Sequence, residues 1–232
     1  MRTAEIALSN GSVLKLRQKD FHGSARGATD ATGTTLWPTA LPLLLHLQGM
    51  WPSLQASTGV MRPLRVLELG AGCGLLGMGL AATCGANVVL SESGAALGDG
   101  EEDGTARSWL ESNVELNREV CELHGGQVST TKLSWGDAAD MAATRSQWAE
   151  GFDLCIASDV LYDNGRYPEL LATLEAFSGS SPETAKARGT DADAAAAVLG
   201  YQIRNGQERR FGDESEHFTV LRDMIPGVPK PG

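Results

Sequence analysis

The chain has 232 residues, 42% of them hydrophobic, and a formal net charge of -10 at pH 7. This length and composition favour one well-cored domain. The acidic charge argues against a nucleic acid or an anionic membrane as partner, because holding phosphates requires a basic field. No stretch approaches about 18 uninterrupted apolar residues, and the N-terminus lacks a signal-peptide core. We therefore expect a cytoplasmic protein, a monomer, that neither spans nor binds a membrane.

The four cysteines, Cys73, Cys84, Cys121 and Cys155, stand far apart and form no C-x-x-C pair. The four histidines form no ligand cluster with them. This spacing predicts no metal site and no disulfide framework. Cys73, Cys84 and Cys155 lie in apolar stretches, where we expect small core residues rather than reactive thiols.

The first 48 residues predict a hairpin followed by a helix. "EIALSNGSVLKL", residues 5–16, alternates polar and apolar residues around Asn10-Gly11, a strong signal for a β-hairpin. "LWPTALPLLLHLQ", residues 36–48, is apolar at helical spacing. Pro42 within it predicts a kink or a late helix start.

From Leu64 onward the chain alternates between predicted strands and predicted helices. The strands are expected at residues 64–69, 86–92, 128–135, 152–158 and 194–204, and the helices at residues 74–85, 106–120 and 166–177. This alternation predicts an α/β, Rossmann-like fold, with a mostly parallel twisted sheet and helices on both faces. Ligands of such sheets bind beyond the carboxyl ends of the strands, which is where we place Glu68, Glu92, Trp135 and Asp159.

Three further segments predict less regular structure. Residues 93–106 and 178–194 are rich in small, polar and acidic residues, which is typical of solvated surface insertions. Residues 214–225 fit a helix, with Phe218, Leu221 and Ile225 on one face, but "FTVL" within them fits a strand equally well.

A glycine-rich turn, Gly70, Gly72 and Gly74, lies between the first predicted strand of the alternating region and its helix. Glycines there let the backbone approach a ligand, and the helix N-terminus adds amide donors. A dinucleotide fingerprint requires glycine where this chain has Leu75. Glu92 ends the next strand, where a carboxylate can accept hydrogen bonds from both hydroxyls of a ribose. The pair indicates a nucleoside-bearing cofactor, although a tight turn and an exposed strand-end acid remain the alternatives.

The motif "VLELGAGCGLLGMGLAATCGANVVLSE" resembles that of class I S-adenosylmethionine-dependent methyltransferases. Other segments resemble the seven-β-strand protein-lysine methyltransferases of the family 16 or methyltransferase-like-21 group: "LWPTALPLL", "WLESNVELN", "LSWG" and "SDVLY". The resemblance covers residues 36–204. It implies a single methyltransferase domain over residues 1–232, with an N-terminal extension (1–35), a cofactor-binding core (36–204) and a shortened C-terminal region (205–232).

The resemblance implies S-adenosylmethionine as cofactor and assigns roles to seven residues around it. Gly70, Ala71 and Gly72 are expected to approach its methionine part, Glu92 its ribose, although the family more often has Asp there, and Trp135 its adenine. Trp37 is expected to lie over the cleft from the N-terminal helix, and Ser158 to line it. The alternatives for Trp135 and Trp37 are packing roles in the core.

Asp159 and Tyr162, in the D-x-x-Y motif, are expected to face the substrate nitrogen. A lysine amine has a reference pKa near 10.4 and must lose a proton before it attacks carbon. A carboxylate can accept its hydrogen bonds, and a phenol offers an oxygen or a ring face. The alternative is that Asp159 caps a helix, a role that Asp163 could fill in its place. Arg204 matches an arginine of the family, for which we expect no more than a salt bridge.

The resemblance therefore implies transfer of a methyl group to a lysine of a partner protein. The alternatives are another acceptor (a small molecule, a protein histidine or an N-terminus) or an inactive binding module. The module is favoured by the C-terminus, because enzymes of this fold usually add two strands after the fifth and only 28 residues follow Arg204. We expect those strands to be missing or rebuilt.

Overall fold

The structure, a computed structural model, describes residues 2–19, 31–94, 105–177, 196–201 and 219–220. The strands are β1 (Arg2–Ala7), β2 (Val13–Gln18), β3 (Arg65–Leu69), β4 (Asn87–Glu92), β5 (Gln127–Lys132), β6 (Leu154–Ser158), β7 (Ala196–Tyr201) and β8 (Thr219–Val220). The α-helices are α1 (Ala40–Thr58), α2 (Leu75–Cys84), α3 (Ala106–Glu122), α4 (Ala138–Gln147) and α5 (Tyr167–Phe177). Two 3-10 helices, η1 (Ala31–Thr34) and η2 (Asn164–Arg166), join them.

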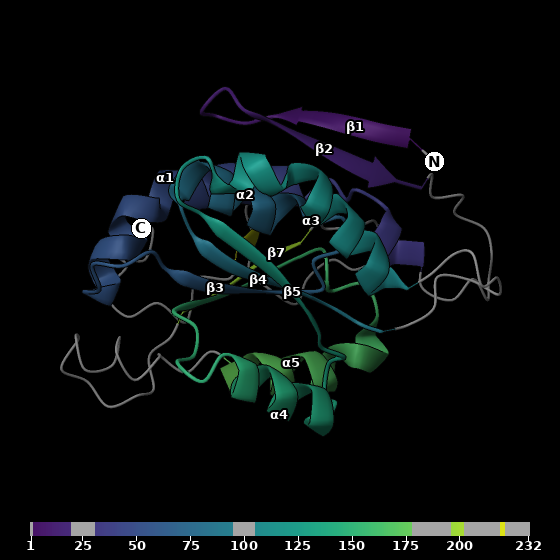
Figure 1. The fold of residues 1–232 in the computed structure, drawn as a ribbon. Coiled ribbons are helices and arrows are strands. Elements are labelled where there is room, and N and C mark those ends of the chain that lie inside the picture. The colour runs from purple at the N-terminus through teal and green to yellow at the C-terminus, as the bar shows by residue number, and fades with distance from the viewer. Residues whose placement is uncertain (1, 20–30, 95–104, 178–195, 202–218, 221–232) are drawn as a thin grey trace.

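The central sheet has the strand order β5-β4-β3-β6-β7-β8. The first five strands of that order are parallel, and β8 pairs antiparallel with β7. Helices α1, α2 and α3 cover one face, and α4 and α5 cover the other (Figure 1). The predicted α/β architecture is thereby confirmed. None of the helices in the described part of the chain is long and apolar enough to cross a membrane.

The sheet is buried on both faces, which explains the continuous apolar runs of its central strands. Successive β3 residues alternate between the two cores: Val66 packs with the α1–α3 side, and Leu67 and Leu69 pack with the α4–α5 side. Parallel strands that neighbour one another end at the same edge of a sheet. The segments following β3, β4, β5 and β6 therefore gather at one edge.

Helix α1 begins later than the apolar pattern. Its first residue is Ala40, so Pro42 falls in the first turn, where a missing backbone N–H costs no hydrogen bond. Trp37 consequently precedes the helix and does not project from it, which corrects the expected position. Its indole Nε1 donates to the carbonyl of Thr32, 2.9 Å away, and so ties Trp37 to η1.

The N-terminal hairpin is confirmed. Strands β1 and β2 pair antiparallel from Arg2 with Gln18 to Ala7 with Val13. Gly11 adopts a left-handed φ of 85° in the turn, a conformation that glycine adopts without steric cost. The Asn10 side chain donates to the carbonyl of Ala82 at 2.9 Å. The turn is thus anchored to the end of α2, and the hairpin lies outside α2 and α3 (Figure 1).

The sheet continues past β7 with one short antiparallel strand, β8, which agrees with the expectation that the final strands are missing or rebuilt. Val220 pairs with Gly200 and Thr219 with Tyr201, so the strand alternative for "FTVL" is correct for these two residues. β8 is short, and the expected helix over 214–225 otherwise lies outside the described residues, as do Arg204 and most of the two predicted insertions. Thr105, at the end of the first insertion, caps α3 by accepting from the Ser108 amide at 3.0 Å.

Helix α4 is an element that the sequence pattern did not predict. Asp137 caps it, with Oδ1 accepting from the amides of Ala139 at 2.9 Å and Asp140 at 2.8 Å. Only Asp140 and Thr144 of its residues are buried, so the helix lacks a wide apolar stripe. An apolar repeat at helical spacing is the main sequence signal for a helix, and α4 has none that is wide enough to predict it.

Three of the four cysteines are buried, namely Cys73, Cys121 and Cys155, and Cys84 is partly exposed. All four are free thiols. The expectation of core residues is therefore confirmed for Cys73 and Cys155, whereas Cys84 lies at the margin of the core.

Candidate functional site

The glycine turn between β3 and α2 depends on its glycines for backbone geometry. Gly70, Gly72 and Gly74 all have left-handed φ values, of 63°, 54° and 83°. A methyl group built on Gly70 would lie 3.1 Å from the Trp135 ring and 3.2 Å from Val160 Cγ1. The turn therefore brings the backbone of β3 against side chains that follow β5 and β6.

Glu92, at the end of β4, holds the glycine turn from the side. Its Oε2 accepts from the Gly72 amide at 2.9 Å, and its Oε1 accepts from the Ser93 amide at 2.9 Å. Each carboxylate oxygen has a second lone pair and can accept a further hydrogen bond. Glu92 is thus positioned as an acceptor of donors from a ligand, as a ribose diol would provide.

Trp135 lies in the segment between β5 and α4, which is fixed from two sides. The Gly136 amide donates to Thr173 Oγ1 on α5 at 2.9 Å, and the Ser134 amide donates to Asp140 Oδ2 at 3.0 Å. Burial opposes ionisation of Asp140, but hydrogen bonds from Ser134 and from Lys132 outweigh it and lower the pKa of this carboxyl. The charged Asp140 therefore holds the segment that carries Trp135.

Asp159 directly follows β6 in a left-handed conformation, with φ of 55°. Asp159 is the only described non-glycine residue with a positive φ, and aspartate is one of the few residues that tolerates it. Its amide donates to the carbonyl of Gly200 at 2.8 Å, and 8% of the residue is exposed. The helix-capping role that was the alternative for Asp159 is filled by Asp163: its Oδ1 accepts from the Gly165 amide in η2 at 2.9 Å.

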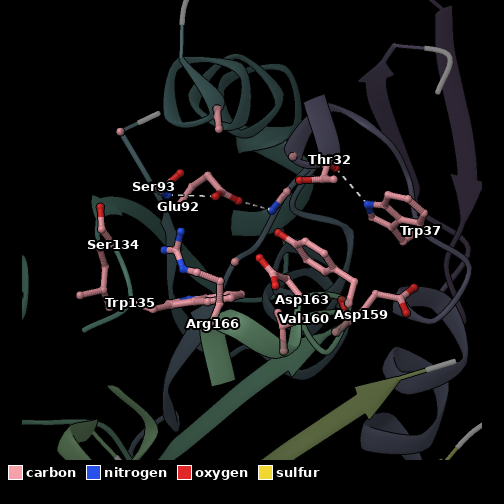
Figure 2. Close-up of a pocket in the computed structure, with 18 of the residues that line it drawn as sticks. Thr32, Trp37, Glu92, Ser93, Ser134, Trp135, Asp159, Val160, Asp163 and Arg166 are labelled. Carbon is pink, nitrogen blue, oxygen red and sulfur yellow. Dashed lines mark hydrogen bonds between the residues drawn. The ribbon is translucent and has the colours of Figure 1, made fainter. Parts of the chain in front are cut away.

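These groups line one cavity of about 540 Å³ at the carboxyl ends of the strands. Figure 2 shows Glu92, Trp135 and Asp159 around it, with Thr32 and Trp37 on a further side. Eight of the nine predicted site residues lie in its wall: Trp37, Gly70, Gly72, Glu92, Trp135, Ser158, Asp159 and Tyr162. Tyr162 is 47% exposed, so the phenol stands at the cavity mouth.

Two predicted positions are corrected. Ala71 does not line the cavity: its side chain packs in the α1–α3 core, and its amide donates to the Ser91 carbonyl at 2.9 Å. Glu68 was placed at the ligand end but is buried against α2, where Oε2 accepts from the Gly77 amide at 2.9 Å. Burial raises the pKa of Glu68 to about 8, with a smaller upward contribution from the charge of Glu92.

Several wall residues were missed by the sequence reasoning. They are Thr32, Gly33, Ser93, Gly94, Ala106, Lys132, Leu133, Ser134, Val160, Asp163 and Arg166. Ser93 and Ser134 adjoin predicted residues, so proximity in the chain was an available signal. Thr32 and Gly33 had none, because η1 reaches the cavity only through tertiary contacts.

The cavity offers carboxylate acceptors, a flat aromatic face and exposed backbone. Ligand sites commonly occupy about 300–1,000 Å³ and place few polar groups among apolar ones. In the ranges that the structure describes, no group of three or more His, Cys, Asp or Glu side chains is arranged to hold a metal ion.

The family model and the curated relatives both indicate one family. A family model described as lysine methyltransferase matches residues 18–213. Protein N-lysine methyltransferase METTL21A of Danio rerio is 36% identical over 186 residues, which is 80% of this chain and 68% of that protein. Protein-lysine N-methyltransferase rrg1 of Schizosaccharomyces pombe is 31% identical over 162 residues, 70% of this chain and 46% of that protein.

The chain spans about half the length of several curated relatives that it matches. Among solved structures, a SAM-dependent methyltransferase from Agrobacterium tumefaciens has a TM-score of 0.48 and 17% identity, covering 88% of this chain and 54% of its own. So weak a likeness adds no weight to the assignment. The match over residues 18–213, together with the METTL21A similarity, is sufficient: the chain belongs to the lysine methyltransferase family.

Proposed function

We propose that this chain is an S-adenosylmethionine-dependent protein-lysine N-methyltransferase, acting as a cytoplasmic monomer on a lysine of a partner protein. One observation carries the proposal. The glycine turn after β3 and the D-x-x-Y motif after the neighbouring β6 line the same cavity. A cofactor site and an acceptor site in one cavity are what a direct transfer between two bound molecules requires.

The residues present fit the cofactor. S-adenosylmethionine supplies a methyl group on a positively charged sulfur, joined to a ribose and an adenine. Glu92 would hold the ribose hydroxyls, Trp135 would pack against the flat base, and the backbone at Gly70 and Gly72 would lie along the methionine part. A methyl group at Gly70 would lie 3.1 Å from the Trp135 ring, so the glycine turn and the proposed partner of the adenine adjoin each other.

Asp159 and Tyr162 suit an amine acceptor. Asp159 is mostly buried beside the cavity, and a carboxylate there favours a hydrogen-bonded amine over water. Tyr162 offers its ring face or phenol oxygen to the lysine stem and ammonium at the mouth. Their task is to bind the ammonium, let it release a proton to water, and direct the nitrogen lone pair into the cavity.

The test is transfer of a radiolabelled methyl group from S-adenosylmethionine into a cell lysate, comparing wild type with Asp159→Asn. Asparagine preserves the size of the side chain and tolerates the left-handed backbone, so the substitution removes the charge and one acceptor oxygen without changing the shape. Glu119→Gln, on an exposed position of α3, is the matched control. We expect a discrete labelled protein with wild type and control, mapped to a lysine, and its loss with Asp159→Asn. Affinity for S-adenosylhomocysteine, the form of the cofactor without its transferable methyl group, should stay within a few-fold of the wild-type value.

Other outcomes identify the alternatives. Label in the small-molecule fraction, on histidine or on an N-terminal amine would replace the lysine acceptor. Cofactor binding without any label would support an inactive binding module. Equal loss of transfer and of cofactor affinity in Asp159→Asn would remove Asp159 from the acceptor side.

A further inference from the structure

Helix α3 completes the edge of strand β2 with side chains. Asn113 Oδ1 accepts from the Arg17 amide at 2.8 Å, and its Nδ2 donates to the Arg17 carbonyl at 3.1 Å. Asn117 repeats the pattern on Lys15, accepting at 2.7 Å and donating at 2.8 Å. Each side-chain amide thus pairs with a strand residue as a backbone peptide group would.

The pairing of α3 side chains with β2 depends on the similar axial spacing of residues four apart on a helix and two apart on a strand. Residues four apart on a helix are separated by about 6.0 Å along its axis. Residues two apart on a strand, whose N–H and C=O face the same edge, are separated by about 6.6–6.8 Å. The spacing of Asn113 and Asn117 therefore fits alternate residues of β2, and the edge opposite β1 is occupied.

Asn113 differs from Asn117 in a second contact. Its Nδ2 also donates to the Cys73 carbonyl, 3.2 Å away, in the glycine turn between Gly72 and Gly74. Asn117 instead donates to the Asn113 carbonyl at 2.7 Å, within its own helix. Asn113 is wholly buried and so connects β2, α3 and the glycine turn at one point.

Beyond β2 the connection continues to η1, which we call the roof because Thr32 and Gly33 line the cavity. The Lys19 amide donates to the Thr34 carbonyl at 2.9 Å. A methyl group built on Gly33 would lie 3.7 Å from the Glu92 carboxyl, and one built on Gly72 would lie 3.6 Å from the Gly33 carbonyl. The roof and the glycine turn therefore face each other at contact distance.

We infer that Asn113 is a positioning residue for the cofactor: it fixes the distance between the glycine turn and the roof by bonding to both Cys73 and Arg17. The inference rests on the proposed function. Asn113 does not line the cavity, so its effect is on cofactor affinity and not on the transfer itself. Asn117 holds the hairpin but not the glycine turn.

The test measures S-adenosylhomocysteine affinity by calorimetry, well below the unfolding temperature, for Asn113→Ala and for Asn117→Ala as matched control. Both remove one asparagine and its two bonds to β2. We expect Asn113→Ala to weaken affinity about tenfold or more and Asn117→Ala about threefold or less. With a methylated substrate in hand, Asn113→Ala should raise KM for the cofactor while kcat at saturation is retained. Equal affinities of the two variants would overturn the inference.

Hydrogen exchange gives a readout that does not need the cofactor. The Gly74 amide donates to the Ala71 carbonyl at 2.8 Å inside the turn. Its exchange should accelerate in Asn113→Ala and stay unchanged in Asn117→Ala, and no difference would again contradict the coupling. If wild type bound no cofactor, the proposed function would fail, and the exchange result alone would decide whether Asn113 orders the turn. Asn113→Ser, which retains one donor, replaces the alanine variant if that variant does not fold.

Discussion

Glu92 Oε2 and the backbone amide of Gly72 are joined by a 2.9 Å hydrogen bond between the ends of neighbouring strands β4 and β3. The same carboxylate accepts from Ser93 through its other oxygen. Glu92 therefore shapes the glycine turn even before it meets a ligand. Removing the Glu92 side chain therefore affects both the hydrogen-bond acceptor offered to the ribose and the shape of the cavity wall.

We expect Glu92→Ala to weaken S-adenosylmethionine binding by about 1–3 kcal/mol, the scale of lost hydrogen bonds to a charged group. The cofactor affinity of Glu92→Gln should lie between those of wild type and Glu92→Ala, because its amide oxygen still accepts from one of the two backbone amides. Titration calorimetry measures both, with Glu119→Ala as a control for removal of one negative charge. An unchanged dissociation constant in Glu92→Ala would remove this residue from the site.

Tyr162 tests the acceptor side. We expect Tyr162→Ala to lower methyl transfer to the protein substrate by about 2- to 30-fold, the range of a lost cation–π contact. Tyr162→Phe retains the ring and should lose less. Steady-state kinetics with the labelled substrate measures the change, and cofactor affinity should be unaffected because Tyr162 stands at the mouth. A loss of cofactor affinity in Tyr162→Ala would instead assign Tyr162 to cofactor binding.

Glu68 gives a pH-dependent prediction. Burial raises its pKa from an ordinary 4.5 to about 8, so between these values the folded state binds the proton that the unfolded state has released. The free energy of unfolding therefore falls as pH rises from about 4.5 to about 8 and levels off above. Glu68→Gln removes this contribution, so its stability advantage over wild type should grow across that window. Thermal unfolding between pH 5.5 and 9 measures the difference in stability between Glu68→Gln and wild type. A difference that stays constant with pH would contradict the raised pKa of Glu68.

Asp153 is a stability determinant far from the cavity. Its side chain is fully buried before the start of β6 and accepts from Arg62 at 2.6 and 3.0 Å and from the Arg65 amide at 2.8 Å. We expect Asp153→Ala to lower the free energy of unfolding by about 1.5–3 kcal/mol, because the partly exposed Arg62 and the Arg65 amide lose the charged acceptor that they share. Arg118→Ala breaks an exposed pair and should cost about 0–1 kcal/mol. Urea unfolding compares them, and similar losses would contradict the buried role.

Much of the fold was predictable because each central strand is a short, mostly apolar run, followed by a glycine turn after β3 and ending in a polar residue in β4 and β6. β3, β4 and β6 were found within two residues of their bounds. Strand order could not be read from the chain, since it depends on how the helices pack. Helix α4 was missed because its residues form no apolar stripe: it is held by the Asp137 cap and by the bonds of Asp140 to Ser134 and Lys132, with Met141 packing on the core.

The site was predictable where chain position determines geometry. Gly70, Gly72, Glu92 and Asp159 follow strands that end at one edge, so their convergence follows from the topology. Glu68 failed because it is the fourth residue of five in β3 and directs its carboxyl toward α2. The roof could not be predicted from the sequence, because Gly33 reaches the cavity through contacts with Gly72, Glu92 and Ala106, which are far from it along the chain.

The burial of the cysteines has a practical consequence for labelling. Burial raises the pKa of Cys73, Cys121 and Cys155 to about 12, and only the thiolate reacts with alkylating reagents. Burial raises the pKa of Cys84, at the end of α2, as well, but Cys84 is the one thiol that is not fully buried. A maleimide dye added to the folded protein should therefore attach at that single position, outside the cavity wall, and give a fluorescent form without any engineered cysteine.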